Sequence, residues 1–263
     1  MKTTLGQLCD HLESIAPLAL QENYDNAGLL YGDRDVEITG VLCSLDATSE
    51  LVIEAEERGC NVLVAHHPII FSGVKKLSRD HYVGRAIIEA IRRNIAIYAI
   101  HTNLDNILDK GVNQAIAARL GLQQVQILSP RSIDEKAGAG LTGMLPEAMH
   151  EKDFLPFVKT QMKTACVRHT ALTGKEIRKV ALCGGAGSFL IHQAIQSGAD
   201  AYITADVKYH EFFEADGRIL LLDIGHFESE QFTIPLLAEI ISEKFPNFAA
   251  YCTELNTNPV HYF

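Results

Sequence analysis

The stretch VLCSLDATSELVIEAEERGCNVLVAHHP, residues 41–68, decides the fold class of this chain. Its residues 41–45 form an apolar run typical of a buried strand, and residues 49–58 have helical spacing that stops at Gly59. Residues 62–65 form a second apolar run, so the stretch predicts one strand–helix–strand unit. Such units bring strands together in a sheet that helices cover.

The same alternation continues after this stretch. Residues 82–94 have helical spacing, residues 95–100 form another apolar run, and residues 112–120 are expected to form a helix that Gly121 ends. The sequence therefore predicts an α/β fold with a parallel or mixed sheet.

A second stretch, VALCGGAGSFLIHQAIQSGADAYITADV at residues 180–207, has the same layout as the first. Gly59 matches Gly198, and His67 falls opposite Asp206 when one gap is allowed. The next apolar run also recurs, and each copy ends on a histidine, His101 and His226. Two related α/β halves are the simplest explanation, and a chance likeness between two strand–helix–strand stretches is the alternative.

Residues 126–178 interrupt the alternation. They contain Pro130, Pro146 and the glycine-rich GAGLTG, which indicate turns and the start of a second domain. We therefore expect two α/β sandwich-like domains built from related halves, each with a mixed sheet covered by helices. One domain is expected to comprise residues 1–125 and 216–263, and a second, smaller one residues 126–215.

The chain of 263 residues is 47% hydrophobic, enough to bury a sizeable core, and carries a net charge of −10. A surface of this sign repels a nucleic-acid backbone, so binding to DNA or RNA is disfavoured. Six cysteines are scattered singly, which is typical of buried thiols in a reducing compartment. We find neither a secretory h-region nor a segment of membrane-spanning length, and we expect a cytoplasmic protein that does not bind membranes.

His66 and His67 directly follow the predicted strand at residues 62–65. Neighbouring side chains of a regular strand point to opposite faces, so both histidines reach one site only where the strand has ended. Pro68 supplies that end, because it cannot donate to a ladder and disfavours helix at His67. The alternative buries one histidine and exposes the other.

Two further apolar runs end in polar residues. The run at residues 95–100 is followed by His101, Thr102, Asn103 and Asp105. An ordinary polar loop with an Asx turn is the alternative there. In ILLLDIGHFESEQF, Gly225 ends the strand, and His226 and Glu230 are spaced to share one helix face. A solvated helix start is the alternative, because acidic side chains suit that end of the helix dipole.

All three groups lie just past the carboxyl end of a buried strand, the edge where sites form in open α/β sheets. Three such groups arise by accident less often than one. Leaving His101 aside, they supply three imidazoles and two carboxylates, too many ligands for one tetrahedral zinc ion. The set suits two divalent metal ions, Zn, Fe, Mn or Ni, at ~3.5–4 Å from each other with a hydroxide for attack.

Two other motifs follow strands in the second half of the chain. The loop CGGAGSF at residues 183–189 can present backbone N–H groups to a phosphate, but tight strand–helix packing explains its glycines better. In YITADVKYHEFF, three polar residues are candidates to line the cavity: Asp206, Lys208 and His210. Satisfied loop side chains are the equal alternative for these three.

Nine motifs along nearly the whole chain resemble one known family: NYDNAGLLYG (23–32), SLDAT (44–48), HHPIIF (66–71), HTNLD (101–105), GVNQAIAARLGL (111–122), CGGAGSF (183–189), TADVKYH (204–210), GHFESE (225–230) and NTNPV (256–260). This is the GTP cyclohydrolase I type 2 homologue family, also called the NIF-three-like family, here in its short form without an inserted middle domain. The chain departs from the family pattern at Tyr24, Leu30 and Ala205, where Trp, Gln and Gly are usual.

The resemblance implies a dinuclear metal centre in the first of the two expected domains. The implied ligands are His66, His67, Asp105, His226 and Glu230. The two carboxylates are the best candidates to bridge, because each has two oxygens to share. The resemblance also implies a toroidal homohexamer whose metal sites face an internal cavity. Further candidates are the proton shuttles His101 and His210 and the cavity or ligand-supporting residues Asp206, Lys208 and Thr102.

These features together predict a metal-dependent hydrolase of unknown substrate, GTP cyclohydrolase-like by the family's name, with a nucleotide or other phosphate compound preferred. A non-catalytic metal-binding scaffold or a protein-interaction protein is the alternative. A thiol enzyme using Cys43 or Cys183 is disfavoured, because neither has a histidine beside it in sequence and both lie in apolar surroundings.

Overall fold

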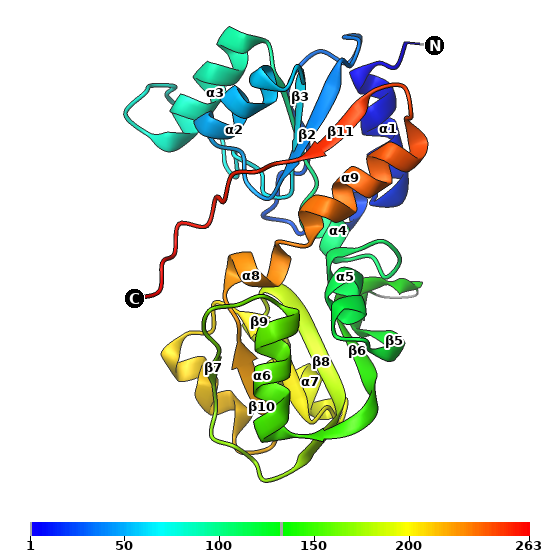
Figure 1. Ribbon diagram of the computed structural model, residues 1–263, viewed down its shortest axis with the longest axis vertical. Coiled ribbons are helices and arrows are strands. Elements are labelled where there is room, and N and C mark those ends of the chain that lie inside the picture. The colour runs from blue at the N-terminus through cyan, green and yellow to red at the C-terminus, as the bar shows by residue number, and fades with distance from the viewer. Residues whose placement is uncertain (1, 132–133) are drawn as a thin grey trace. The chain divides into compact units, whose positions relative to one another are not determined.

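The computed structural model describes residues 2–131 and 134–263, which form two units (Figure 1). Unit 1 comprises Met1–Leu104 and Thr233–Pro259, and unit 2 comprises Asp105–Phe232 and Val260–Phe263. The chain passes from unit 1 to unit 2 inside α4 (Thr102–Asp105) and returns between α8 (His226–Glu230) and α9 (Thr233–Lys244).

Unit 1 is built on a five-stranded sheet in the order β1-β4-β3-β2-β11. Its strands are β1 (Gly28–Tyr31), β2 (Gly40–Ser44), β3 (Val62–Ala65), β4 (Ala96–Ala99) and β11 (Ala249–Cys252). β2, β3, β4 and β11 run parallel, whereas β1 pairs antiparallel with β4. The three central strands β2, β3 and β4 are buried at every residue, as expected where helices cover both faces of a sheet.

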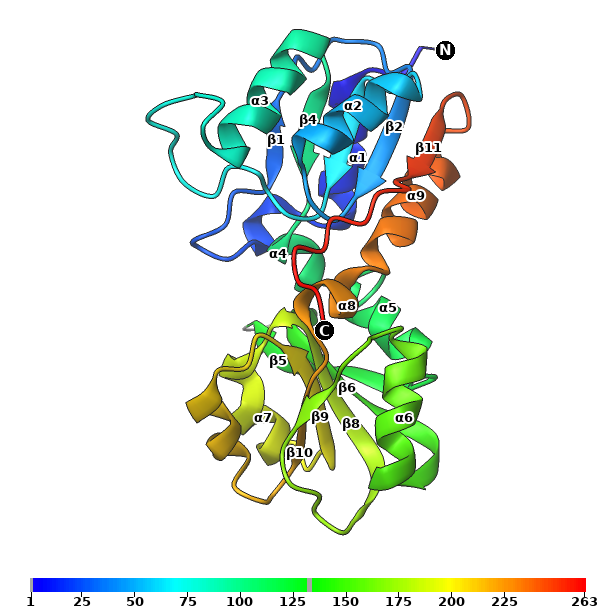
Figure 2. The same ribbon diagram turned by 60° about the vertical axis from the view of Figure 1, so that its left-hand side comes forward.

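Helices lie on both faces of the unit 1 sheet (Figure 2). α2 (Ser49–Glu57) and α3 (Tyr82–Arg93) pack on one face through a buried cluster that includes Leu42, Leu63 and Ile97. α1 (Leu5–Ile15) and α9 lie on the other face, and the short 3-10 helix η1 (Leu18–Leu20) follows α1. α1 begins with a capping box, because the backbone amides of Gln7 and Thr4 each donate to the other residue's side chain.

Unit 2 contains a six-stranded mixed sheet in the order β5-β6-β8-β9-β10-β7. Its strands are β5 (Gln123–Arg131), β6 (Asp134–His150), β7 (Arg168–His169), β8 (Glu176–Ala186), β9 (Ala201–Ala205) and β10 (Leu220–Asp223). β8, β9 and β10 run parallel, and the remaining strands pair antiparallel with their neighbours.

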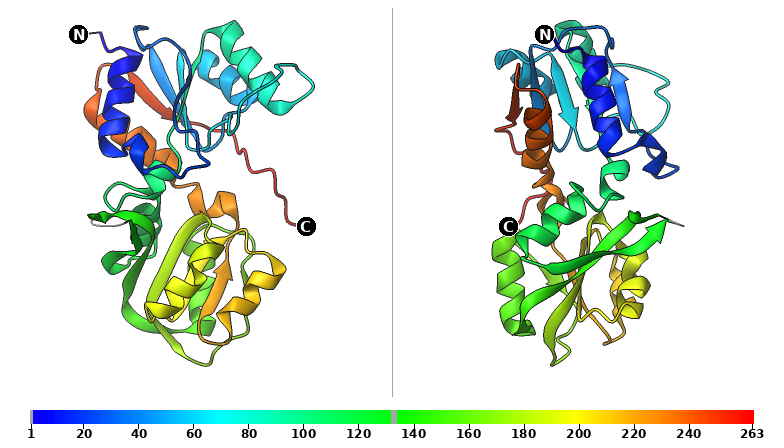
Figure 3. Two further views of the ribbon diagram at one scale, coloured as in Figure 1. Left: turned by 180° about the vertical axis from the view of Figure 1, so that it is seen from behind. Right: turned by 90° about the vertical axis from the view of Figure 1, so that its right-hand side faces the viewer.

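The helices of unit 2 also cover two faces of their sheet (Figure 3, right). α6 (Glu151–Gln161) lies on one face, where its Phe154 and Val158 are fully buried. α7 (Ile191–Gln196) lies on the opposite face in a buried cluster with Ala181, Cys183 and Tyr202. The other helical segments are α5 (Val112–Arg119), η2 (Ser188–Leu190) and η3 (Tyr209–Ala215).

The predicted elements are confirmed within one or two residues at their ends. The run at residues 62–65 coincides with β3, and the helix expected at residues 49–58 is α2. Each unit holds three adjacent parallel strands with helical connections, β2-β3-β4 in unit 1 and β8-β9-β10 in unit 2. The α/β class with mixed sheets covered by helices is therefore confirmed, and the two repeated stretches share one topology.

The division into units differs from the expected boundaries at residues 125 and 216. Residues 105–125 and 216–232 belong to unit 2, because α5 packs on β8 and β10 pairs in parallel with β9. The sequence pattern could not show this, since these segments have the same alternation as their neighbours in unit 1. The two units are also nearly equal in length. Along the residues that the structure describes, no helix combines the length and apolarity required to cross a membrane.

Candidate metal centre

The two adjacent histidines of unit 1 lie at the carboxyl end of β3. β3 ends at Ala65, and the backbone amides of His66 and His67 then donate to the carbonyl oxygens of Ser44 and Leu45, at 3.2 and 2.8 Å. The two imidazole rings are 5.0 Å apart between centroids. Because the strand has ended, both rings reach the same place, as the sequence predicts.

His101 joins this pair at the end of the neighbouring strand β4. Its ring centroid is 5.2 Å from that of His66 and 5.4 Å from that of His67. One ring nitrogen from each of the three lies within 4.8 Å of the others. Unit 1 therefore gathers three imidazoles, including that of His101, which the sequence predicts as a proton shuttle and not as a ligand.

Each of these histidines is oriented through its Nδ1 atom. His66 Nδ1 lies 2.8 Å from the carbonyl oxygen of Ile100, and His67 Nδ1 lies 2.8 Å from Asp46 Oδ1. His101 Nδ1 lies 2.8 Å from Asp25 Oδ1. When Nδ1 carries the proton and donates it, the second nitrogen, Nε2, has a lone pair for a metal ion. Hydrogen bonds of this type are characteristic of metal-binding histidines.

The two aspartates that orient His67 and His101 are themselves fixed. Thr257 Oγ1, in the NTNPV motif near the C-terminus, donates to Asp46. Thr102 donates to Asp25 through both its backbone amide, at 3.0 Å, and its hydroxyl. Burial alone would raise the pKa of Asp25, but the hydrogen bonds of His101 and Thr102 outweigh it and lower the pKa to about 2.

Unit 2 holds the carboxylates and the remaining histidine of the predicted set. His226 and Glu230 are the first and last residues of α8, and His226 Nε2 is 3.1 Å from Glu230 Oε2. Carboxylate oxygens of Asp105 and Glu230 approach within 4.8 Å of each other. Glu230 is almost completely buried, an unusual place for a carboxylate unless cations or hydrogen bonds compensate.

His226 follows the same rule as the histidines of unit 1. Its Nδ1 lies 2.7 Å from Asp206 Oδ2, so Asp206 orients the ring from the end of β9. Asp206 has a positive φ of 54°. Burial by itself lowers the pKa of His226, but the hydrogen bonds and charges of Asp206 and Glu230 outweigh it and raise the pKa to about 11. Proton and metal ion therefore compete for Nε2 at this position.

The glycine loop at residues 184–187 packs against α8. Gly185 has a φ of +64°, and a Cβ atom there would lie 2.4 Å from Glu230 Oε1. The amides of this loop already donate to side chains of unit 2, from Gly184 to Asn113, from Gly185 to Ser229 and from Gly187 to Thr204. These glycines serve tight packing rather than a phosphate cradle, because their amides are already used.

The other predicted cavity residues have different surroundings. Thr102 supports His101 through their shared partner Asp25. Lys208 precedes η3, where its backbone amide donates to Glu211 Oε2 at 2.7 Å. His210 is exposed in an aromatic cluster with Tyr209 and Phe213. Among the residues that the structure describes, His210 belongs to none of the groups that could hold a metal ion.

Two residues that support the site, Asp25 and Asp46, are not among the site residues predicted from the sequence. Both lie in motifs of the family resemblance, NYDNAGLLYG and SLDAT, but nothing in their spacing ties them to a particular histidine. Burial raises the pKa of the Cys43 and Cys183 thiols far above the ordinary range, so neither is a nucleophile.

The chain belongs to the Duf34/NIF3 (NGG1p interacting factor 3) family, whose model matches residues 3–259. It is 34% identical to a "GTP cyclohydrolase 1 type 2 homolog" of Clostridium acetobutylicum over 88% of this chain and 86% of that one. It is 33% identical to the Clostridium perfringens protein of the same name over 91% of this chain and 92% of that one. The family resemblance that the motifs indicate is thus confirmed.

Solved structures agree with this assignment. A hypothetical protein of Staphylococcus aureus superposes with a TM-score of 0.93 at 30% identity, covering 100% of both chains. A Bacillus cereus protein related to NIF3 superposes with a TM-score of 0.92 at 24% identity, covering 100% of this chain and 99% of that one. The second likeness concerns the fold alone.

Proposed function

We propose that this protein binds two divalent metal ions and uses them for hydrolysis. The proposed ligands are His66, His67, Asp105, His226 and Glu230. The observation that carries the proposal is the shared orientation of the histidines, each with Nδ1 at a carbonyl or carboxylate oxygen, so that Nε2 can bind metal. Imidazole and carboxylate ligands together suit Zn, Fe, Mn or Ni.

The carboxylates have a different part in this proposal. Asp105 and Glu230 have oxygens close enough to bind neighbouring ions, and each carboxylate has two oxygens to share. Their negative charges offset the charges of the ions in surroundings where Glu230 is buried. We therefore propose that these two side chains bridge the ions.

Two bound ions would supply a Lewis acid and a water molecule of lowered pKa. The chain supplies the proton path. Asp25 and His101 form a carboxylate–imidazole pair, in which the aspartate fixes the orientation of the ring. We propose that His101 accepts the proton of the attacking water and passes it on to the leaving group.

A nucleotide or another phosphate compound is the substrate class that we propose. The relatives in both Clostridium species are named as homologs of a GTP cyclohydrolase, an activity that opens a nucleotide ring by hydrolysis. An acidic chain can still bind an anionic substrate when metal ions supply positive charge.

Metal content tests the proposal directly. Elemental mass spectrometry of the wild type is expected to find about two ions per chain, lost in a variant with His67→Ala and Glu230→Ala. Glu239→Ala, an exposed glutamate of α9, is the matched control and is expected to keep both ions. Absence of metal after reconstitution with Zn, Fe, Mn and Ni would refute the centre.

The role of His101 can be separated from that of the ligands. His101→Gln is expected to keep two ions but to lower turnover at least about a hundredfold, the usual contribution of a general base. Loss of one ion would instead make His101 a metal ligand, a role that its place beside His66 and His67 also allows.

A second candidate function is a non-catalytic metal-binding scaffold or interaction protein. The family description, which names an interacting factor, favours it. Chelation distinguishes the two, because a scaffold would lose its fold or assembly whereas a hydrolase would lose turnover and stay folded. Sedimentation of the same samples would test a further proposal carried by the resemblance, a toroidal homohexamer.

A further inference from the structure

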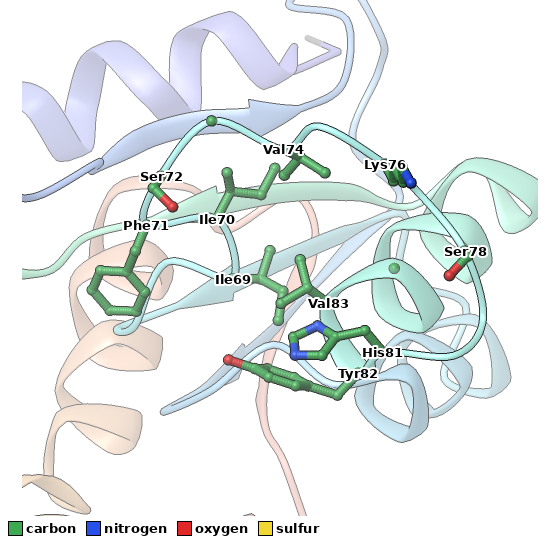
Figure 4. A pocket seen from close by; sticks show the side chains of 12 residues that line it. Ile69, Ile70, Phe71, Ser72, Val74, Lys76, Ser78, His81, Tyr82 and Val83 are labelled. Atoms are coloured by element: carbon green, nitrogen blue, oxygen red, sulfur yellow. The ribbon is translucent and has the colours of Figure 1, made fainter.

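In unit 1, the segment that follows His66 and His67 in the sequence lines a cavity. Its volume is about 310 Å³, and it is lined by residues of the loop after β3 and of the start of α3: Ile69–Val74, Lys76, Ser78 and His81–Gly84. This volume lies at the lower end of the range for pockets that bind small molecules. Figure 4 shows Ile69, Ile70, Val74 and Val83 gathered inside the loop.

The surface around this cavity is unusually apolar for exposed residues. Large hydrophobic side chains are exposed along the loop and at the start of α3, Phe71 by 50%, Val74 by 41%, Leu77 by 49% and Tyr82 by 55%. Such residues gathered in one short segment indicate a surface that something covers. The rings of His81 and Tyr82 lie 4.6 Å apart at one side of the cavity, where they offer faces for stacking (Figure 4).

The same segment is basic although the chain is acidic. Residues 69–85 contain four cationic side chains, Lys75, Lys76, Arg79 and Arg85, against the single acid Asp80, in a chain of net charge −10. Arg79 is paired with Glu89 at 2.5 Å. Among the described residues, Lys75 and Lys76 have no carboxylate partner, and Lys76 lines the cavity. This charge favours an anionic ligand.

The loop that forms the cavity is fixed in place. Asn26 Nδ2 donates to the carbonyl oxygen of Ile70 at 2.6 Å, and Arg85 Nη1 donates to that of Arg79 at 3.1 Å. At the far end the backbone of Ser78 contacts Gly84 so closely that a Cβ there would lie 2.0 Å from the Ser78 carbonyl oxygen. The cavity is therefore formed before any ligand arrives.

Phe71 connects the cavity with the imidazole of His101. It lines the cavity, and its ring meets the ring of His101 edge to face at 5.7 Å between centroids. A ligand that fills the cavity and extends past Phe71 reaches the imidazoles of unit 1.

We propose that this cavity binds the part of the substrate remote from the reaction, an aromatic ring that carries an anionic group. In this proposal, the aliphatic side chains gathered inside the loop and the rings of His81 and Tyr82 contact the ligand's ring. Lys76 contacts its anionic group. The inference rests on the proposed function only for calling the ligand a substrate, because all the binding groups belong to unit 1 and none is a proposed metal ligand.

Titration calorimetry of the full chain, both metal-loaded and stripped of metal, tests this. The probes are the four nucleoside 5′-monophosphates and 4-nitrophenyl phosphate, with the nucleosides and ribose 5-phosphate as matched probes that lack the anion or the ring. At least one monophosphate is expected to bind with or without metal. Lys76→Ala is expected to weaken that binding about tenfold and to leave nucleoside binding unchanged.

Tyr82→Ala is expected to weaken both the monophosphate and the nucleoside about tenfold and to leave ribose 5-phosphate unchanged. The controls Lys159→Ala and Tyr209→Ala remove an exposed lysine and an exposed tyrosine of unit 2, and are expected to change nothing. Binding by no probe, or binding that ignores both Lys76 and Tyr82, would overturn the inference even in a metal-loaded, active protein. If the chain takes up no metal but binds a probe in a way that depends on Lys76 and Tyr82, the inference holds although the hydrolase proposal fails.

Discussion

Both units contain three adjacent parallel strands with helical connections, but the residues at the ends of these strands differ in chemistry. In unit 1 the ends of β3 and β4 present imidazoles, His66, His67 and His101, and the carboxylates that hold two of them come from other loops. In unit 2 the end of β9 presents a carboxylate, Asp206, whose task is to orient His226 after β10. The shared strand layout thus fixes where functional residues occur, whereas the residue types that follow each strand decide whether a position is suited to bind metal or to support a ligand.

The largest expected effect is on metal content, which should fall further when a proposed ligand of unit 2 is changed than when one of unit 1 is changed. Glu230→Gln removes a charge that we assign to both ions, so metal content is expected to fall from about two per chain to none. His67→Ala removes a ligand of one ion, and about one ion is expected to remain. Elemental analysis after dialysis measures both, with Glu239→Gln as control. Equal losses in the two variants would show that the two ions bind cooperatively, so that the chain holds either both or neither.

The next effect concerns the aspartates that orient the histidines. Asp46→Asn in unit 1 and Asp206→Asn in unit 2 are each expected to weaken metal binding about 10–100-fold, because an uncharged amide, which can also present its NH2 group, holds the Nδ1-protonated ring less firmly than a carboxylate does. Competition with a fluorescent chelator measures the affinity. Asp153→Asn, an exposed aspartate of α6, is expected to leave it unchanged. If only one of the two variants loses metal affinity, only the histidine that its aspartate orients binds metal.

A third effect separates the glycine loop of unit 2 from an ordinary turn. Gly185→Ala is expected to reduce both metal content and stability, because its Cβ would meet Glu230 Oε1 at 2.4 Å and its φ is positive. Gly198→Ala has a similar φ but nothing within 4 Å of the added Cβ. It should lower the free energy of unfolding by about 1 kcal/mol and keep the metal. Urea unfolding with parallel metal analysis would contradict this if both variants kept their ions.

The last effect is the pH dependence of stability of the metal-free protein, where a residue of unit 1 acts at acidic pH and a residue of unit 2 at alkaline pH. The pKa of Asp25 is lowered to about 2, so its contribution to stability, about 2 kcal/mol, is present above the usual value near 3.8 and lost as pH falls towards 2. The pKa of His226 is raised to about 11, so its contribution is present below 6.5 and lost as pH rises through 11.

Urea midpoints between pH 2 and 11 test both signs. Asp25→Asn is expected to flatten only the acidic limb of the profile, and His226→Gln only the alkaline limb. A profile that neither variant changes would show that these hydrogen bonds are absent without metal.

Much of the fold is predictable because parallel strands buried on both faces are continuous apolar runs. Residues 62–65 illustrate this, since every residue of β3 is buried. The boundary between units was not predictable, because α5 and β10 have local patterns like those of unit 1 and only their packing on β8 and β9 assigns them to unit 2.

The sequence by itself determined the class of fold, the family and the residues at the strand ends, because hydrophobic periodicity and strand termini are local properties of the chain. His66 and His67 could be singled out in this way. Only the tertiary structure decided that Asp46 orients His67 and that Asp25 orients His101, contacts that join residues 21 and 76 positions apart. It also decided that Gly185 makes room for Glu230. Such pairings depend on how loops from separate strands meet at the sheet edge, which no local pattern encodes.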